Sequence, residues 1–204
     1  MNYLAHFHLA WPDENLIVGG LEGEFFKGPL PGKLTPCLQA GVRLHRAIDG
    51  FTDRHPTLAG ARAAFPAGSR RYAGILMDLA FDYFLSRHWS RFSDIPLDAF
   101  SEHIYQTLTE RESSLSPAGQ RMAQRLREYR VLTVYRNWEA VPETAARLGG
   151  RLRRANPLQD SQRLLEPLRD KLEQSFLSFY PALQQFSKET GKLVQADRVT
   201  IHTP

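Results

Sequence analysis

The sequence predicts an all-α protein that folds as a single compact multi-helix domain. Apolar residues recur with helical spacing along most of the chain, and no stretch shows the sustained alternation of a half-buried strand. Prolines and glycines separate the helical segments from one another. A chain of 204 residues, 42% of them hydrophobic, is long enough to bury a substantial core. We therefore expect one helical domain that needs no disulfide.

Prolines and glycines set the expected boundaries in the first half of the chain, because proline lacks an amide donor and clashes with the preceding helical turn. The segment Gly28-Pro29-Leu30-Pro31-Gly32 is the strongest loop signal. Further breaks fall at Pro12, Pro56, Pro66 and Pro96. The expected helices are 2–10, 14–27, 37–54, 57–65 and 69–91.

In the second half, Pro117, Pro142 and Pro157 stand where helices begin or end. The expected helices are 97–112, 117–136, 139–153 and 158–189. Pro181 lies inside the last of these, and we expect it to kink or split that helix. We assign residues 1–190 to the domain and residues 191–204 to a polar C-terminal tail that frays.

The charge balance indicates the kind of partner that the protein meets. Lys and Arg number 26 against 22 Asp and Glu, and arginines cluster in 125–130 and 151–154. Such clusters are either solvated helix faces or a basic surface that attracts an acidic partner. Nucleic acid would also suit a basic surface, but no helix-turn-helix, zinc-finger or single-strand-binding pattern is present. We therefore expect no nucleic-acid partner, and the sequence does not predict an oligomeric state.

The sequence predicts a cytoplasmic protein without a membrane segment. No apolar run reaches the ~18 residues needed to span a bilayer. The N-terminus MNYLAHFHLAWPDE lacks the basic region and the long apolar region of a signal peptide. Cys37 is the single cysteine, so no intramolecular disulfide can form, which fits a reducing compartment.

Two carboxylates in the helix expected at 69–91 are the most informative charges of the chain. In the stretch YAGILMDLAFDYFLSRHW, apolar residues lie nearly all round the helix, which predicts burial. Asp78 and Asp82 are four residues apart and project from one face. A buried carboxylate without a partner is very costly, so each needs a metal, an arginine or several hydrogen bonds. His88 could approach the same site from the end of the helix.

A second set of candidates lies in the helix expected at 37–54. In the stretch VRLHRAIDGFTDRH, His45, Asp49 and Asp53 follow one another at i, i+4 and i+8, which places them in one stripe. An apolar stripe runs beside them. The candidate ligands therefore lie at the border of the core, where a site could be shielded from water.

The N-terminal segments contribute further candidates. His6 and His8 flank Phe7 and diverge around a helix, so we expect only one of them to face a site, and we favour His6. Glu22 and Glu24 lie in an apolar, glycine-rich stretch and diverge in the same way. The sequence does not decide which glutamate faces the site.

These candidates also have a purely structural interpretation. A histidine at the border of a core is often only hydrogen-bonded, and Asp49 with Arg46, or Asp78 with Arg71, could form buried ion pairs. The recurrence of i,i+4 pairs on two helices favours a metal site, and imidazole with carboxylate suits Mn²⁺, Fe²⁺, Mg²⁺ or Zn²⁺. No GxSxG elbow, Walker motif or dinucleotide-binding glycine pattern is present.

Three long stretches together resemble the acyl carrier protein phosphodiesterase family: MNYLAHFHLA, LHRAIDGFTDRHP and DLAFDYFLSRHW. Shorter matches are FFKG after Glu24, VYRNW at 134–138 and FYP at 179–181. The resemblance implies a metal-dependent enzyme, with Mn²⁺ favoured. Its substrate would be acidic holo-acyl carrier protein, from which it would hydrolyse the phosphodiester between 4′-phosphopantetheine and a serine.

The resemblance also implies an all-helical fold that is distantly HD-domain-like, although the chain contains no adjacent His-Asp dipeptide. The family pattern has Asp where this chain has Glu24, and Asn where it has Gly20. The longer arm of Glu24 moves its carboxylate by about 1.5 Å. A site adapted to Asp would be disturbed by this change.

We predict a phosphodiesterase site that binds one or two divalent cations, most readily Mn²⁺, with Mg²⁺ or Fe²⁺ as alternatives. The candidate metal ligands are His6, His45, Asp49, Asp78 and Asp82. Arginines would hold the phosphate, and a glutamate or histidine would position water or protonate the leaving serine oxygen. The candidates for these catalytic roles are Glu24, His88, Arg46 and Arg71. Two alternatives stay open: a phosphohydrolase of nucleotides or another small phosphodiester, and a helical module that binds acyl carrier protein without cleaving it.

Overall fold

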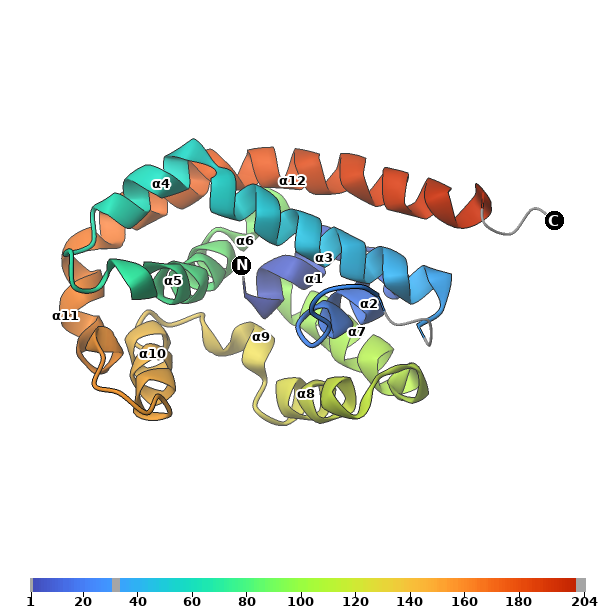
Figure 1. Cartoon of the computed structure of the whole chain (residues 1–204), viewed down its shortest axis with the longest axis horizontal. Helices are drawn as coiled ribbons and strands as arrows, with labels where there is room; N and C mark the ends of the chain where they lie inside the picture. The colour runs from blue at the N-terminus through green and yellow to red at the C-terminus, as the bar shows by residue number, and fades with distance from the viewer. Residues whose placement is uncertain (1, 31–33, 201–204) are drawn as a thin grey trace.

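The structure, a computed structural model, describes residues 2–30 and 34–200, and side chains as far as residue 196. Within these residues it contains helices and no strand, so the all-α prediction is confirmed. Figure 1 shows the helices packed as a single domain. The elements are α1 (Tyr3–Ala10), α2 (Glu14–Gly23), α3 (Pro36–Arg54), α4 (Pro56–Ala63), η1 (Arg70–Tyr72), α5 (Ala73–Arg87), α6 (Trp89–Phe92), α7 (Leu97–Glu110), η2 (Glu112–Ser114), α8 (Pro117–Glu128), α9 (Val131–Val134), α10 (Ala140–Gly150), η3 (Pro157–Asp160), α11 (Ser161–Leu165), η4 (Glu166–Leu168) and α12 (Arg169–Thr200).

Three of the expected helices are divided, which corrects the sequence prediction. The segment 69–91 forms η1, α5 and α6, and α5 ends where His88 leaves helical geometry. The segment 117–136 forms α8 and α9 because Arg130 between them adopts the left-handed conformation, with φ of 50°. In the segment 158–189, η3, α11 and η4 precede α12, and prolines begin η3 and lie at the start of η4.

Helix α12 departs from the prediction at its C-terminal end. It is one element from Arg169 to Thr200, so Pro181 does not split it, although Figure 1 shows that α12 bends along its length. It also continues past Gly191, where we expected a fraying tail. Buried Val194 gives these last turns an apolar contact. The division of the chain at residue 190 and the HD-like relationship both stay predictions.

Helix α1 lies at the centre of the fold and contacts α2, α3, α5 and α12. Six of its eight residues are buried, including His6. A helix in this position cannot leave polar side chains in water, so its histidines need partners from the surrounding helices. Helix α1 therefore decides which residues of the neighbouring helices meet at the centre.

Two glycines bring α2 and α3 into direct backbone contact. A Cβ atom on Gly19 would lie 2.2 Å from the carbonyl oxygen of Leu38, and one on Gly41 would lie 2.7 Å from the Cα atom of Gly19. No other residue leaves room for this approach. The end of α2 is thereby held against the middle of α3, where His45 lies.

His8 is held in the core by two hydrogen bonds. Its Nδ1 lies 2.8 Å from the hydroxyl oxygen of Tyr180, and its Nε2 lies 3.1 Å from the carbonyl oxygen of Phe92. A neutral ring protonated on Nε2 satisfies both contacts, because it accepts from the hydroxyl group and donates to the carbonyl group. Burial lowers the pKa of His8 to about 4, although the hydrogen bond to Phe92 acts in the opposite direction. His8 therefore has a structural role.

This burial predicts a measurable pH dependence of folding. The folded pKa of His8, about 4, lies below the ordinary value of 6.5, so the unfolded chain binds an extra proton between these two values. The free energy of unfolding should therefore fall as the pH is lowered from 6.5 to about 4, by up to about 1.4 kcal/mol per pH unit for this one group. We expect a shallower fall in His8→Gln than in the wild type. Urea unfolding followed by circular dichroism between pH 4.5 and 7.5 measures both slopes, and equal slopes would contradict the prediction.

Candidate functional site

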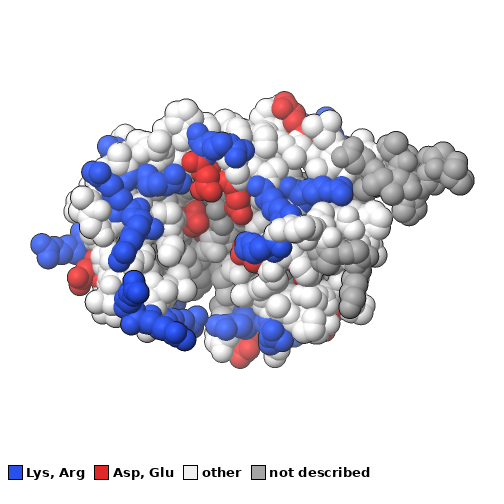
Figure 2. Space-filling model, in the orientation of Figure 1, with Lys and Arg blue, Asp and Glu red and all other residues white. Residues whose placement is uncertain are grey.

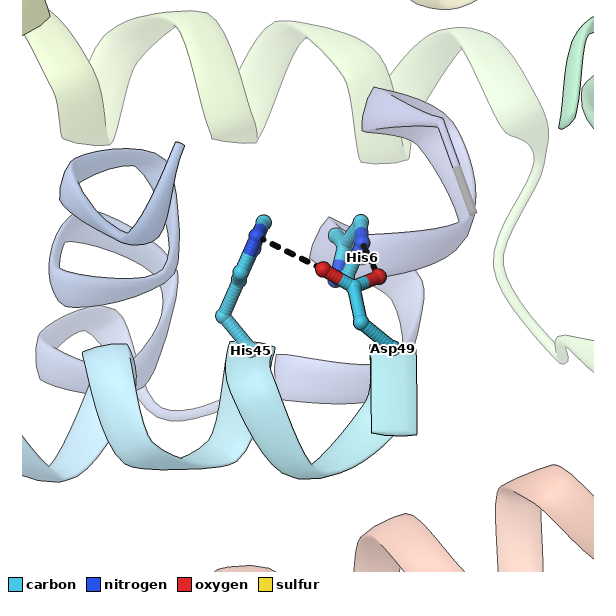
Figure 3. A group of neighbouring side chains, drawn as sticks. All are labelled: His6, His45 and Asp49. Atoms are coloured by element: carbon cyan, nitrogen blue, oxygen red, sulfur yellow. Dashed lines mark hydrogen bonds and ion pairs between the residues drawn. The ribbon is translucent and has the colours of Figure 1, made fainter. Parts of the chain in front are cut away.

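Two histidines and one carboxylate meet where α1 crosses α3. Asp49 lies between the two rings: its Oδ1 is 3.1 Å from Nε2 of His6, and its Oδ2 is 3.2 Å from Nε2 of His45. Figure 3 shows both histidines directed at this carboxylate, with His45 and Asp49 on α3 and His6 on α1. One ligand atom from each residue lies within 4.8 Å of the others. The three residues thus form a compact set of two nitrogen donors and one oxygen donor.

Burial and hydrogen bonding decide the charges of this set. The side chains of His6 and His45 are 5% and 4% exposed, and their rings stack with centroids 4.0 Å apart. Burial, together with the adjacent His45, lowers the pKa of His6 to about 3. Burial alone would raise the pKa of Asp49, but the hydrogen bonds to His45 and His6 outweigh it and hold that pKa well below its usual range. The set therefore presents neutral His6 beside an ionised carboxylate.

These donors fit a divalent cation. Neutral imidazole nitrogen and carboxylate oxygen are the ligands that Mn²⁺, Fe²⁺ and Zn²⁺ take in proteins. The Nδ1 atoms of His6 and His45 are also buried without a hydrogen-bond partner among the described residues. In the described part of the chain, the polar contacts of both rings are therefore with the carboxylates of Asp49 and Glu24.

A polar cavity of about 280 Å³ opens beside Asp49. It is lined by Glu24, Asp49, Thr52, Asp53, Leu58, Arg62, Gly74, Met77, Asp78 and Phe81. Figure 2 shows acidic side chains gathered at a hollow, with Lys and Arg side chains around it. The lining thus combines acidic side chains, apolar side chains and one arginine next to the candidate ligand set.

Comparison with known proteins decides the family. The family model for acyl carrier protein phosphodiesterase matches residues 1–183. An acyl carrier protein phosphodiesterase of Escherichia coli O6:K15:H31 (strain 536 / UPEC) is 34% identical over 186 residues, which cover 91% of this chain and 96% of that protein. The chain belongs to the acyl carrier protein phosphodiesterase family.

Membership of this family makes the protein a hydrolase. The relative of the same name in Escherichia coli (strain K12 / DH10B) is 34% identical over 184 residues, or 90% of this chain and 95% of that protein. No solved structure matches the chain. Among the helices that the structure describes, none has the length and apolar character required to cross a membrane.

The family resemblance singled out position 24, and the structure brings Glu24 to the cavity. Its Oε1 lies 3.9 Å from Nε2 of His45. Asp78 lines the same cavity from α5. Glu22 points away, because its Oε1 accepts a hydrogen bond of 2.6 Å from the backbone amide of Ser116. Of the two glutamates between which the sequence did not decide, Glu24 is therefore the one that faces the cavity. Of the two histidines, His6 is the one that meets Asp49.

Asp82 lies apart from this set and binds backbone instead. Its Oδ2 accepts from the amide of Leu4 at 3.1 Å, and its Oδ1 accepts from the amide of Ala5 at 3.2 Å. Helix α1 has no side-chain cap from Asn2, so Asp82 satisfies two amides that α1 would otherwise bury unpaired. Burial raises the pKa of Asp82 to about 7, although these two hydrogen bonds oppose the shift. Its assignment as a metal ligand stays a prediction.

Three further candidates contact residues outside the cavity lining. Nε2 of His88 lies 2.6 Å from Oε1 of Glu173 on α12. Arg46 donates from Nη2 to the carbonyl oxygen of Phe26 at 2.7 Å. The guanidinium carbon of Arg71 lies 4.7 Å from the ring centre of Tyr72. The catalytic roles of His88, Arg46 and Arg71 stay predictions.

Sequence reasoning missed Arg62, the arginine that does line the cavity. Its Nη2 lies 3.5 Å from Oδ1 of Asp53, across the junction of α3 and α4. Helix α4 has the sequence PTLAGARA, in which no chemical motif marks this arginine. A signal becomes visible only once the corner between α3 and α4 is known, because this corner brings Arg62 beside Asp53.

Gly23 is expected to set the position of His45. A Cβ atom at Gly23 would lie 2.6 Å from Cγ and 2.8 Å from Cβ of His45, so the whole side chain would have to move. We expect Gly23→Ala to lower the free energy of unfolding by about 1–3 kcal/mol through overpacking. Gly20→Ala is the matched control in the same helix, because nothing lies within 4 Å of its added Cβ, and it should stabilise by up to about 1 kcal/mol. Thermal unfolding measures both, and equal effects would contradict the prediction.

Asp82 is expected to contribute strongly to the stability of the fold. Asp82→Ala leaves two buried backbone amides without acceptors, which should lower the free energy of unfolding by about 2 kcal/mol or more. The control is Asp98→Ala, which removes an exposed carboxylate on α7 and should change stability by less than about 1 kcal/mol. Both variants are compared by urea unfolding at pH 6. A stable Asp82→Ala would show that α1 does not depend on this contact.

Proposed function

We propose that this protein hydrolyses the phosphodiester between 4′-phosphopantetheine and the serine of holo-acyl carrier protein, with a divalent cation held by His6, His45 and Asp49. Family membership supports the substrate, because the relatives are named acyl carrier protein phosphodiesterases. The observation that carries the metal proposal is the meeting of two imidazoles and one carboxylate beside an acid-lined cavity. Mn²⁺ is the proposed cation, and Mg²⁺ or Fe²⁺ are alternatives.

A divalent cation in this position would neutralise charge on the phosphoryl oxygens and make water more acidic near neutral pH. The protein side chains supply the remaining roles. Glu24 stands at the cavity within 3.9 Å of His45, so it is placed to accept a proton from the attacking water. Position 24 carries Glu in this chain, whereas the family pattern has Asp. A catalytic role for Glu24 requires that the longer side chain still reach the water.

Arg62 is the proposed contact for the phosphate. A guanidinium group can donate two parallel hydrogen bonds to phosphate oxygens, and Arg62 is the arginine among the described cavity residues. Its present contact with Asp53 is long, at 3.5 Å, and Asp53 is exposed. Such an ion pair is weak and can be exchanged for a phosphate at small cost. Asp78 lines the same cavity and is the proposed group for the leaving serine oxygen or for a further ligand contact.

The apolar lining residues suit the arm that the substrate carries. Leu58, Met77 and Phe81 line the cavity, and all three are buried. The pantetheine arm is a chain with methyl groups and amides, so it matches a cavity lined by both apolar and polar side chains. The proposed reaction therefore places the phosphate at Arg62 and the arm beside these side chains.

The test is release of phosphopantetheine from holo-acyl carrier protein. We expect release with Mn²⁺ and its loss with chelator, and we expect Asp49→Asn to lower it by about 100-fold or more, because the shared carboxylate is lost. The control is Asp98→Asn, an exposed carboxylate on α7, which should retain wild-type release. The readout is the mass of the carrier protein before and after incubation.

Wild-type protein that releases nothing with Mn²⁺, Mg²⁺ or Fe²⁺ would overturn the proposed function. Asp49→Asn with wild-type release would overturn the assigned cation site alone. A screen of small phosphodiesters and nucleotides under the same conditions distinguishes the proposed substrate from a smaller one.

A further inference from the structure

We propose that Arg121 and Arg125 on α8 form a docking edge for the acidic face of the protein substrate. This inference rests on the proposed function and adds to it the surface that receives the partner. Arg121 and Arg125 are four residues apart on one helix, so their side chains project from the same face. Both are exposed.

Among the described residues, neither arginine has an acidic partner. Within the described part of the chain, no carboxylate lies within 4 Å of the guanidinium group of Arg121 or Arg125. Other arginines of the same region are paired: Arg130 contacts Glu102, and Arg136 lies 2.6 Å from Asp98. Two like charges at i,i+4 destabilise a helix by a few tenths of a kcal/mol. A partner that brings negative charge would offset this cost.

The position of α8 relates these charges to the candidate site. Figure 2 shows basic side chains over the region of α8, on the side of the hollow opposite the acidic cluster. Arg125 and Glu24 both influence Tyr3, whose pKa is raised first by burial, further raised by Glu24 and lowered by Arg125. Arg125 therefore lies within electrostatic range of the same tyrosine as the cavity residue Glu24.

Helix α8 is fixed to the site by a buried carboxylate. Glu22 is 0% exposed and accepts the amide hydrogen of Ser116, the residue that caps α8. Gly119 makes this approach possible, because a Cβ there would lie 2.3 Å from Oε1 of Glu22. Glu24 follows Glu22 by two residues on the same turn. The arginines of α8 therefore stand in a defined position relative to Glu24 and His45.

The charge pattern favours an acidic protein surface as the occupant. The cavity itself is lined by acidic side chains. The basic edge therefore lies outside the proposed reaction centre, where it would contact the surface of a protein substrate. Tyr129, which follows α8 and is 61% exposed, adds an aromatic contact of the kind that protein interfaces use. Oppositely charged surfaces of this kind mainly speed association and are weakened by salt.

The test measures binding of holo-acyl carrier protein by fluorescence anisotropy in the presence of chelator, so that no turnover is needed. We expect Arg125→Glu, and the double variant with Arg121→Glu, to raise the Kd by about tenfold or more at low salt. The difference should shrink at high salt. The matched control is Arg163→Glu on α11, which lies at the left edge of Figure 1, away from α8. It makes the same charge change and should leave the Kd within about twofold.

The outcomes separate this inference from the proposed function. A variant at Arg125 that binds like the Arg163→Glu control would overturn the docking edge, while release by the wild type would still support the function. Binding that depends on Arg125 without release under any metal would support the edge and overturn the function. A wild type that does not bind the carrier protein, or that binds a single-stranded oligonucleotide more tightly through Arg125, would overturn the docking edge. In active protein, KM should rise in Arg125→Glu with kcat unchanged.

Discussion

The whole arrangement depends on the two hydrogen bonds by which Asp82 holds the first turn of α1. Helix α1 begins without a side-chain cap of its own, and its amides at Leu4 and Ala5 lie in the core. An unpaired buried amide costs about as much as a lost hydrogen bond. The carboxylate of Asp82 satisfies both amides from α5. These two hydrogen bonds thus hold α1 in position independently of the contacts of His6 and His8.

Once α1 is fixed, its two histidines take opposite roles on opposite faces. His8 turns to Tyr180 and Phe92 and becomes part of the core. His6 turns to Asp49 and stacks on His45. The two side chains have the same chemistry and lie two residues apart. Only the neighbours on each side of α1 make one of them a structural group and the other a candidate ligand.

Glycines on α2 provide the second constraint. Gly19 meets Gly41 across the two backbones, and Gly23 makes room for the ring of His45. The same turn of α2 carries Glu22 toward α8 and Glu24 toward the cavity. One short segment therefore connects the candidate metal ligands, the cavity and the helix on which we propose that the substrate docks.

The sequence by itself determined the fold class, the family and the stripe that contains His45 and Asp49, because helical spacing and long motifs are local properties of a chain. It also identified Asp82 as a buried charge that requires partners, whereas Asp78 is half-buried. Only the tertiary structure decided the partners of Asp82, since a carboxylate in a core can be satisfied equally by a metal, an arginine or backbone amides. Asp82 accepts hydrogen bonds from amides of α1, and Arg62 lines the cavity from a helix without a motif. The sequence did not predict either arrangement, because each brings together residues that are far apart in the chain.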